Sequence, residues 1–159
     1  MASGKRLDDS PKEIRNKKAS HEYFIGERFE AGIVLCGTEV KAIRLGHAQI
    51  SDAFVRMNRD FEAILFNANI AEYSFGNVGN HKATRARKLL LHKSELKKLK
   101  TAMERAGLTV LPLRIFFSHG LAKVEVAICQ GKKLFDKRDA LKKRTELRET
   151  ERAMARFKH

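Results

Sequence analysis

One stretch, residues 21–55 (HEYFIGERFEAGIVLCGTEVKAIRLGHAQISDAFV), constrains the fold more than any other part of the chain. Aromatic and β-branched residues separated by charges predict a strand over residues 23–35. Thr38 can then cap a short helix over residues 39–45, which Gly46 would end in the left-handed conformation. A strand pattern returns directly afterwards, so this stretch is a complete strand, corner, helix and strand unit.

The charge of the chain points to a polyanionic partner. Its 159 residues carry 33 Lys+Arg against 19 Asp+Glu, a formal net charge of +14. Such an excess attracts nucleic acid first and anionic membrane second. No apolar run approaches the ~20 residues that a membrane span needs, and the N-terminal stretch lacks the apolar core of a secretory signal. We therefore expect a cytoplasmic protein that does not enter a membrane.

The two cysteines, Cys36 and Cys129, lie within apolar segments that resemble strands. Since nothing in their spacing suggests a pair, we expect buried, reduced thiols, as in cytoplasmic proteins. The Cys and His residues do not have the spacing of a metal-ligand set. The sequence therefore predicts neither a metal nor another cofactor.

Further strands and one further helix are expected beyond residue 50. Two hairpins are predicted from paired strand patterns around short polar turns: strands 50–57 and 61–70, and strands 109–117 and 121–129. The predicted helix spans residues 94–106, with Ser94 as its N-cap and Gly107 as its stop.

Several short, bent strands favour a small barrel. Gly26 and Gly32 predict bends or bulges in the first strand, and Pro112 places its strand at an edge or a bulge. We expect a mainly β (α+β) chain: an OB-fold-like antiparallel β-barrel with two or three flanking helices and a basic C-terminal tail. Such barrels bind nucleic acids through one sheet face and its loops.

Two basic segments lie outside the regular pattern. Residues 71–88 are expected to form a loop with Gly76, Asn77, Gly79 and Asn80 at its flexible tip, followed by Lys and Arg residues; long loops in compact domains often carry function. Residues 131–159 hold 11 Lys+Arg and 5 Asp+Glu, a net charge of +6. Because their apolar stripe is too narrow to hold a helix on a core, we expect this tail to be disordered alone and helical on an anionic partner.

The predicted division is thus a flexible arm over residues 1–18, which includes the Ser10-Pro11 pair, a barrel over residues 19–130 and the tail over residues 131–159. The arm and the tail both carry basic residues beside the barrel. A nucleic-acid-binding barrel with two charged extensions follows from the residues alone.

Two other classes of function stay open on this evidence. Glu39-Val40-Lys41 has the E-x-K spacing of metal-dependent nucleases, with Glu30 as the nearest upstream carboxylate. Motifs for nucleophilic hydrolysis and for phosphate-binding loops are absent. A general RNA-binding or ribosomal protein would share the charge without preferring any one folded RNA.

The stretch at residues 21–55 also closely resembles the SmpB family, the SsrA-binding proteins of bacterial trans-translation. The likeness continues through LFNANI (65–70), TRARKLLL (84–91), GKK (131–133) and DKR (136–138). It covers about residues 13–145 in one order with short gaps, which chance does not explain.

This resemblance implies an OB-fold barrel and a non-enzymatic, monomeric RNA-binding protein. It implies that the barrel grips the tRNA-like part of transfer-messenger RNA (tmRNA, or SsrA RNA) and delivers it to the A site of stalled ribosomes. It further implies that the tail enters the empty messenger channel of the small subunit near the decoding centre and becomes helical there.

The resemblance also implies site residues by position. RNA-facing or basic-loop positions are Asn16, Lys17, His21, Glu30, Arg85, Arg87, Lys88, Leu90 and Lys123. Ribosome-binding positions in the tail are Lys132, Lys133, Phe135, Asp136, Lys137, Arg138, Lys142, Lys143, Arg144 and Met154. Glu30 would accept hydrogen bonds from base or ribose donors.

Two positions depart from the family pattern. Phe135 stands where His or Tyr is frequent, so its ring can stack on a base but cannot donate a hydrogen bond. His92 stands where Asn is expected after the 89–91 leucine run.

Overall fold

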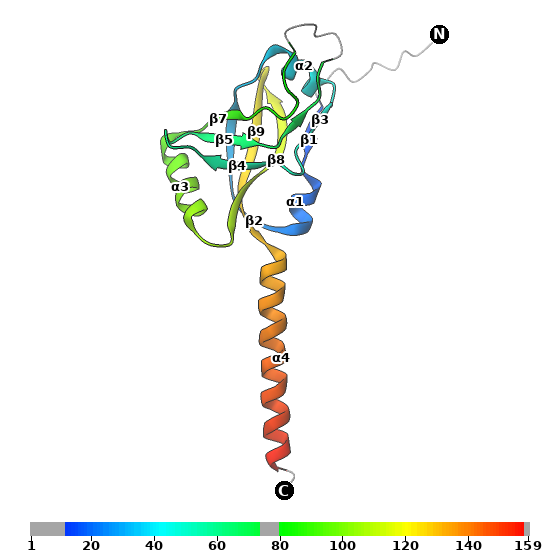
Figure 1. The fold of residues 1–159 in the computed structure, drawn as a ribbon, viewed down its shortest axis with the longest axis vertical. Helices are drawn as coiled ribbons and strands as arrows, with labels where there is room; N and C mark the ends of the chain where they lie inside the picture. Colours follow the sequence, from blue (N-terminus) through cyan, green and yellow to red (C-terminus); the bar gives the residue numbers. More distant parts are fainter. Residues whose placement is uncertain (1–11, 74–79, 158–159) are drawn as a thin grey trace, which may run out of the picture.

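The computed structural model describes residues 12–73 and 80–157, which form a strand-rich body with one long helix leading away from it (Figure 1). The strands are β1 (Ile14–Arg15), β2 (Tyr23–Ile33), β3 (Ala48–Gln49), β4 (Phe54–Met57), β5 (Ala63–Phe66), β6 (Asn69–Ile70), β7 (Arg87–Leu90), β8 (Leu108–Ser118) and β9 (Leu121–Gly131). The helices are α1 (Lys17–Glu22), α2 (Gly37–Arg44), α3 (Lys93–Glu104) and α4 (Lys132–Phe157).

The main sheet is antiparallel throughout and curls back on itself. Its strands follow the order β1-β8-β4-β5-β7-β2-β9, and β9 also pairs with β8. The β4–β8 seam consists of the single pair Val55↔Val110, whereas β8 and β9 pair along nearly their whole length. The fold is therefore a partly open, barrel-like antiparallel sheet with flanking helices, which confirms the predicted class; the ring of strands is less completely closed than the word barrel implies.

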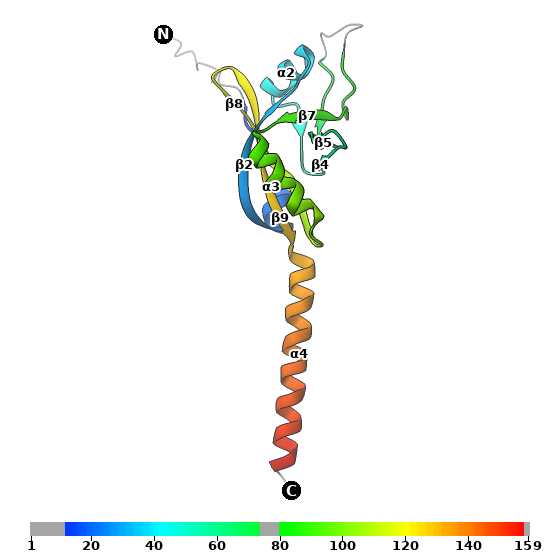
Figure 2. The same cartoon turned by 90° about the vertical axis from the view of Figure 1, so that its left-hand side faces the viewer.

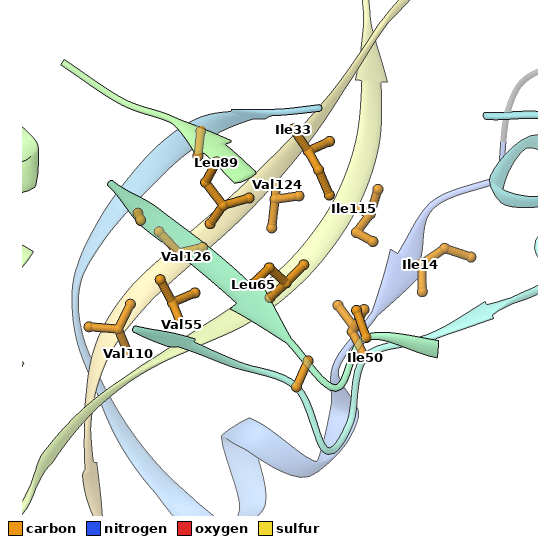
Figure 3. Packing of buried hydrophobic residues seen from close by; sticks show 14 of the residues in the cluster. Ile14, Ile33, Ile50, Val55, Leu65, Leu89, Val110, Ile115, Val124 and Val126 are labelled. Carbon is orange, nitrogen blue, oxygen red and sulfur yellow. The ribbon is translucent and has the colours of Figure 1, made fainter. Parts of the chain in front are cut away.

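The interior of this curled sheet is the main core. Buried aliphatic side chains from β2, β4, β5, β7, β8 and β9 meet there, among them Ile33, Val55, Leu65, Leu89 and Val124 (Figure 3). A smaller buried cluster on the other side of β8 and β9 contains Leu111, Leu113, Ala127 and Cys129, together with Ala19 of α1. These opposite-facing residues alternate along β9 as the period of a strand requires.

A bulge in β8 lets this strand serve both clusters. The β8–β9 register shifts between Pro112 and Arg114, and Val110 and Ile115 both lie in the main core despite their odd spacing. One extra residue between them reverses the alternation. The predicted bulge at Pro112 is confirmed, but β8 is not an edge strand because it pairs with β1, β4 and β9.

A second register shift, between Ile25 and Arg28, bends β2 where it pairs with β9. Gly26 lies within it, as predicted. A Cβ atom at this position would stand 2.9 Å from the Ile128 carbonyl oxygen. The backbones of β2 and β9 approach each other here to a distance that only glycine allows.

The folded body begins earlier than the predicted boundary at residue 19. Ile14 is buried and pairs with Ile115. Asn16 then caps α1 by accepting a hydrogen bond from the Ala19 amide (3.2 Å). Residues 14–18 are part of the body in this structure, while Ser10 and Pro11 lie outside the described residues.

The predicted helices form, with shifted starts. The N-cap of α2 is Cys36 rather than Thr38, because the Glu39 side chain accepts from the Cys36 amide (2.9 Å) and draws the helix start forward. The N-cap of α3 is His92 rather than Ser94. Gly46 and Gly107 have positive φ (79° and 83°) after the two helices, as expected of helix stops.

The first predicted hairpin also forms, but its strands are shorter than the pattern suggests. Residues 50–53 make a turn before β4. The second strand is divided into β5 and β6 at Asn67, whose φ of 60° interrupts the ladder. Asn tolerates this left-handed conformation better than most residues. The second hairpin, β8 and β9, follows the prediction closely.

Cys129 is buried as expected, and burial raises the pKa of its thiol to about 11. Cys36 is exposed at the start of α2, so the prediction of two buried thiols is wrong for this residue. The reason is that β2 ends at Ile33, three residues earlier, so Cys36 lies in a corner and not in a strand.

The helix α4 begins where β9 ends and points away from the sheet in both views (Figures 1 and 2). Its described side chains from Arg144 to Arg156 are exposed. Of the predicted loop tip, Gly76, Asn77 and Gly79 lie outside the described residues, whereas the Asn80 side chain accepts from the Tyr73 amide (3.2 Å) and donates to the Tyr73 carbonyl (2.8 Å). Within residues 12–73 and 80–157, no helix combines the length and apolarity that crossing a bilayer requires.

Candidate nucleic-acid interface

The outer surface of β7, β2 and β9 brings three predicted site residues together. Ala31 and Ile33 of β2 face the core, so the alternation of the strand turns Glu30 and Gly32 outward. Gly32 lies opposite Leu90 of β7 on one side and opposite Lys123 of β9 on the other. We refer to Glu30, Gly32, Leu90 and Lys123 as the Glu30 face.

The Glu30 face combines a charge pair with an exposed apolar side chain. Lys123 Nζ donates to Glu30 Oε1 at 2.7 Å, and the two side chains are 31% and 54% exposed. Leu90 is 53% exposed, which is unusual for a leucine on a strand. The Leu90 side chain lies close over Gly32, since a Cβ at that position would stand 3.2 Å from Leu90 Cβ.

Cations and an aromatic ring continue this surface along β9 and β8. Glu125 accepts from Arg28 (3.2 Å) and from Arg114 (3.1 Å), and the Arg114 guanidinium lies 4.2 Å from the centroid of the Phe116 ring. Phe116 is paired with Lys123. Sequence reasoning missed Arg28, Arg114 and Phe116, although strand alternation from Glu30 and Lys123 could have found them.

Helix α1 borders the same surface. Lys17 and His21 are exposed on it, and Lys17 lines a hollow of about 380 Å³ that Arg28 and Arg114 also line. Asn16 is different: it is 7% exposed, and its side-chain amide donates to the Pro112 carbonyl (2.9 Å). Asn16 therefore fastens α1 to β8, while Lys17 and His21 are presented to solvent.

The predicted basic loop residues occupy three different environments. Lys88 is half-exposed and forms an ion pair with Glu62. Arg85 is 36% exposed and pairs with Glu39 at 2.5 Å. Arg87 is fully buried: it contacts Glu39 and also donates to carbonyl oxygens at 2.6 Å and 3.0 Å. Because its guanidinium is inaccessible, Arg87 does not present charge to an external phosphate in this structure.

Glu39 is the buried centre of this arrangement. Burial alone would raise the pKa of its carboxyl, but hydrogen bonds from the Cys36 amide, Arg85 and Arg87 lower the pKa below its usual value. The carboxylate is therefore charged and balances the two arginines. Its burial and its partners were not predicted from the sequence.

This environment bears on the nuclease interpretation of Glu39 and Lys41. Both Glu39 oxygens accept hydrogen bonds from arginines, and Lys41 lies over the Tyr73 ring at 5.3 Å. Among the residues that the structure describes, no group of three or more His, Cys, Asp and Glu could hold a metal ion. Glu39 thus belongs to an internal ion pair with Arg85 and Arg87, while Lys41 has a different partner, the Tyr73 ring.

The tail residues are placed only in part. Lys132 donates to the Ser20 carbonyl of α1 (3.0 Å) and lies over the Phe24 ring at 5.5 Å, while Arg144 and Met154 are exposed on α4. His92 is exposed at the start of α3. The backbone of the remaining predicted tail residues lies in α4, and their side chains are outside the described part: Lys133, Phe135, Asp136, Lys137, Arg138, Lys142 and Lys143.

A family model described as "SmpB protein" matches residues 13–156 of this chain. The chain belongs to the SmpB family. This match includes the Glu30 face, α1, the arginines around Glu39 and nearly all of α4, so the SmpB assignment rests on the whole body and not on one motif.

Relatives within the SmpB family are similar over most of their length. An SsrA-binding protein of Geobacter metallireducens is 52% identical over 139 residues, which cover 87% of this chain and 90% of the relative. One from Streptomyces avermitilis is 48% identical over 155 residues, covering 97% and 87%.

A solved structure matches this chain in both fold and sequence. A chain from the structure described as "tmRNA-SmpB: a journey to the center of the bacterial ribosome" is 44% identical to this one, with a TM-score of 0.66. The match covers 77% of this chain and 85% of that chain. The SmpB fold and the SmpB sequence pattern therefore coincide here.

Proposed function

We propose that this chain binds the tRNA-like part of tmRNA and acts with it in the rescue of stalled ribosomes by trans-translation. The names and the description of its relatives support both partners. The observation that carries the proposal is the convergence of Glu30, Leu90 and Lys123 on one exposed face.

The proposed RNA contact combines charge with readout of shape. Lys123 neutralises a phosphate, and Glu30, released from Lys123, accepts hydrogen bonds from ribose or base donors. Leu90 and the Phe116 ring supply apolar and stacking contacts. Lys17, Arg28 and Arg114 extend the contact around the hollow beside α1, and His21 is exposed on the same helix.

Other residues act indirectly in this proposal. Asn16 holds α1 against β8, and Arg87 is anchored inside the body. Both keep neighbouring contact residues in place without touching RNA. Lys88 would contact RNA by exchanging its Glu62 partner for a phosphate.

We further propose that residues 131–159 form a separate functional unit that occupies the empty messenger channel near the decoding centre. Their net charge of +6 and the exposure of the described α4 side chains suit an RNA-lined channel. In the free protein the segment is expected to be largely disordered. The role is one of binding and delivery by a monomer in the cytoplasm, without catalysis.

The test compares two lysine variants of equal charge. Lys123→Ala is expected to weaken binding to the tRNA-like RNA roughly tenfold, because hydrogen bonds to charged groups contribute about 1.5–3 kcal/mol. Lys97→Ala, on the exposed face of α3, is expected to leave the affinity within about twofold. Gel-shift titration at fixed salt measures both.

A folded RNA of equal length without tRNA-like shape serves as competitor. If it competes as well as the tRNA-like RNA, or if both lysine variants weaken binding equally, general charge explains the binding and the proposal fails.

A further inference from the structure

The first turn of α2 ties together segments that are far apart in the sequence. Glu39 is 0% exposed. Its Oε1 accepts from the Cys36 amide (2.9 Å) and from Arg85 Nη2 (2.5 Å), and its Oε2 accepts from Arg87 Nε. One carboxylate thus joins the end of β2 to the segment that leads into β7.

Arg87 extends this network across the body. Its Nη1 donates to the Ala68 carbonyl (2.6 Å), and its Nη2 donates to the Ala83 carbonyl (3.0 Å). The guanidinium therefore links the β5–β6 connection with the residues before β7. A buried charge needs such complete pairing, because an unpaired one is strongly destabilising.

Thr38, the residue before Glu39, makes a second anchor. His81 Nε2 lies 2.8 Å from the Ile70 carbonyl, and His81 Nδ1 lies 2.8 Å from Thr38 Oγ1. A carbonyl only accepts, so Nε2 carries a proton and donates to it, and the Thr38 hydroxyl, which can donate or accept, pairs with Nδ1. Residues 81–87 are held by α2 at two points.

Arg85 is the member of the network that reaches the surface. Its Nη2 contacts Glu39 and also donates to the Val34 carbonyl (3.4 Å), and its side chain is 36% exposed. Val34, whose amide donates to the Lys88 carbonyl (3.0 Å), stands two residues after Gly32 of the Glu30 face. The contacts with Glu39 and with the Val34 carbonyl therefore hold the Arg85 guanidinium beside the Glu30 face.

We infer that Glu39 is a positioning residue for RNA binding, which fixes Arg85 at the edge of the Glu30 face. The inference rests on the proposed function. A positioned guanidinium meets a phosphate without first losing side-chain entropy. Without the carboxylate, the two arginines repel each other and Arg85 leaves its place.

The substitution Glu39→Gln separates the positioning role from simple electrostatics, because the two predict opposite changes in RNA affinity. Glu39→Gln raises the net charge, so simple electrostatics predicts tighter RNA binding. The positioning role predicts weaker binding, by roughly tenfold. Glu104→Gln, an exposed acid on α3, makes the same charge change and is expected to leave binding equal or slightly tighter.

A double-mutant cycle with Arg85→Gln tests whether Glu39 affects RNA binding through Arg85. In the otherwise unchanged chain, Arg85→Gln is expected to weaken binding roughly tenfold, and in the Glu39→Gln background to change it less than twofold. An equal cost of Arg85→Gln in both backgrounds overturns the inference, as does an Arg85→Gln variant that binds normally. The proposed function is judged separately, by Lys123→Ala.

Hydrogen exchange separates local positioning from global stability. Glu39→Gln is expected to speed exchange at residues 81–88 while amides of the β8–β9 ladder keep their protection; equal loss at both sites overturns the inference. Should Glu39→Gln not fold, Glu39→Asp replaces it in the cycle. Asp keeps the charge but cannot reach Cys36 and Arg85 together, and normal binding and normal exchange in this variant also overturn the inference.

Discussion

At the scale of single residues, side chains of the same type are buried at one position and exposed at the next, according to which face of the strand they occupy. Arg87 and Leu89 alternate inward along β7, while Lys88 and Leu90 alternate outward. That alternation is readable in the sequence. An arginine is nevertheless seldom assigned to a core, because burying its charge requires a partner, and the partner, Glu39, is 48 positions away.

Gly26 carries a residue-scale prediction about stability. Gly26→Ala places a Cβ 2.9 Å from the Ile128 carbonyl oxygen, so the β2 and β9 backbones must separate. The expected loss in the free energy of unfolding is about 1–3 kcal/mol, measured by denaturant titration.

The control for Gly26 is Gly37→Ala. A Cβ at Gly37 meets nothing within 4 Å, and alanine favours the helix by about 0.5–1 kcal/mol. We expect a neutral or stabilising effect there. Equal destabilisation by both changes would contradict the close approach described for β2 and β9.

The Glu30 face shows what residue patterns can and cannot reveal. Alternation predicts that Glu30 faces outward, and the family resemblance places Leu90 and Lys123 at matching positions. Their meeting on one face depends on β7 and β9 both pairing with β2. No local pattern encodes that pairing, because it depends on long-range strand order.

At the scale of elements, hairpins and the longer flanking helices were predictable, and very short elements were not. The turn at residues 118–120 and the alternating strands on either side predict β8 and β9. The six residues of α1 and the two residues of β1 carry too few positions for a periodic signal. They form because Asn16 and Ile14 find partners on β8, which is tertiary information.

The tail helix carries the element-scale prediction. An isolated, highly charged helix is marginal in water, and the described α4 side chains from Arg144 onward have no core to cover. In the free protein, amides of residues 136–156 are expected to exchange rapidly, and binding to the small ribosomal subunit should slow them. Strong protection in the free protein would contradict this prediction.

At the scale of the whole molecule, charge is divided between the body and the tail. The chain has a net charge of +14, of which residues 131–159 contribute +6. Net charge alone predicts attraction to a polyanion and does not divide it between partners. The division came from the change of pattern at residue 131 and from the family resemblance, and the structure adds that α4 starts where β9 ends.

This division gives a whole-molecule prediction. The chain truncated after Gly131 is expected to bind the tRNA-like RNA with unchanged affinity and unchanged salt dependence. In both the full and the truncated chain, the affinity should fall by about 10³–10⁵ between about 50 and about 200 mM salt, as for six to ten phosphate contacts. The truncated chain should fail to support tagging on stalled ribosomes. Binding titrations at several salt concentrations and a reconstituted translation assay measure the two effects; a shallower salt slope after truncation would mean that the tail also contacts this RNA.

The direct continuation of β9 into α4 has a mechanical consequence. Gly131 ends the strand in register with Tyr23, and the 26 residues of α4, once helical, span about 39 Å at 1.5 Å per residue. If the tail occupies the messenger channel as proposed, the helix sets the distance between the RNA-binding body and the point in the channel that its end reaches. Adding one residue after Gly131 would lengthen the helix by about 1.5 Å and turn its far end by about 100°, so rotational phase as well as length determines what the tip can touch.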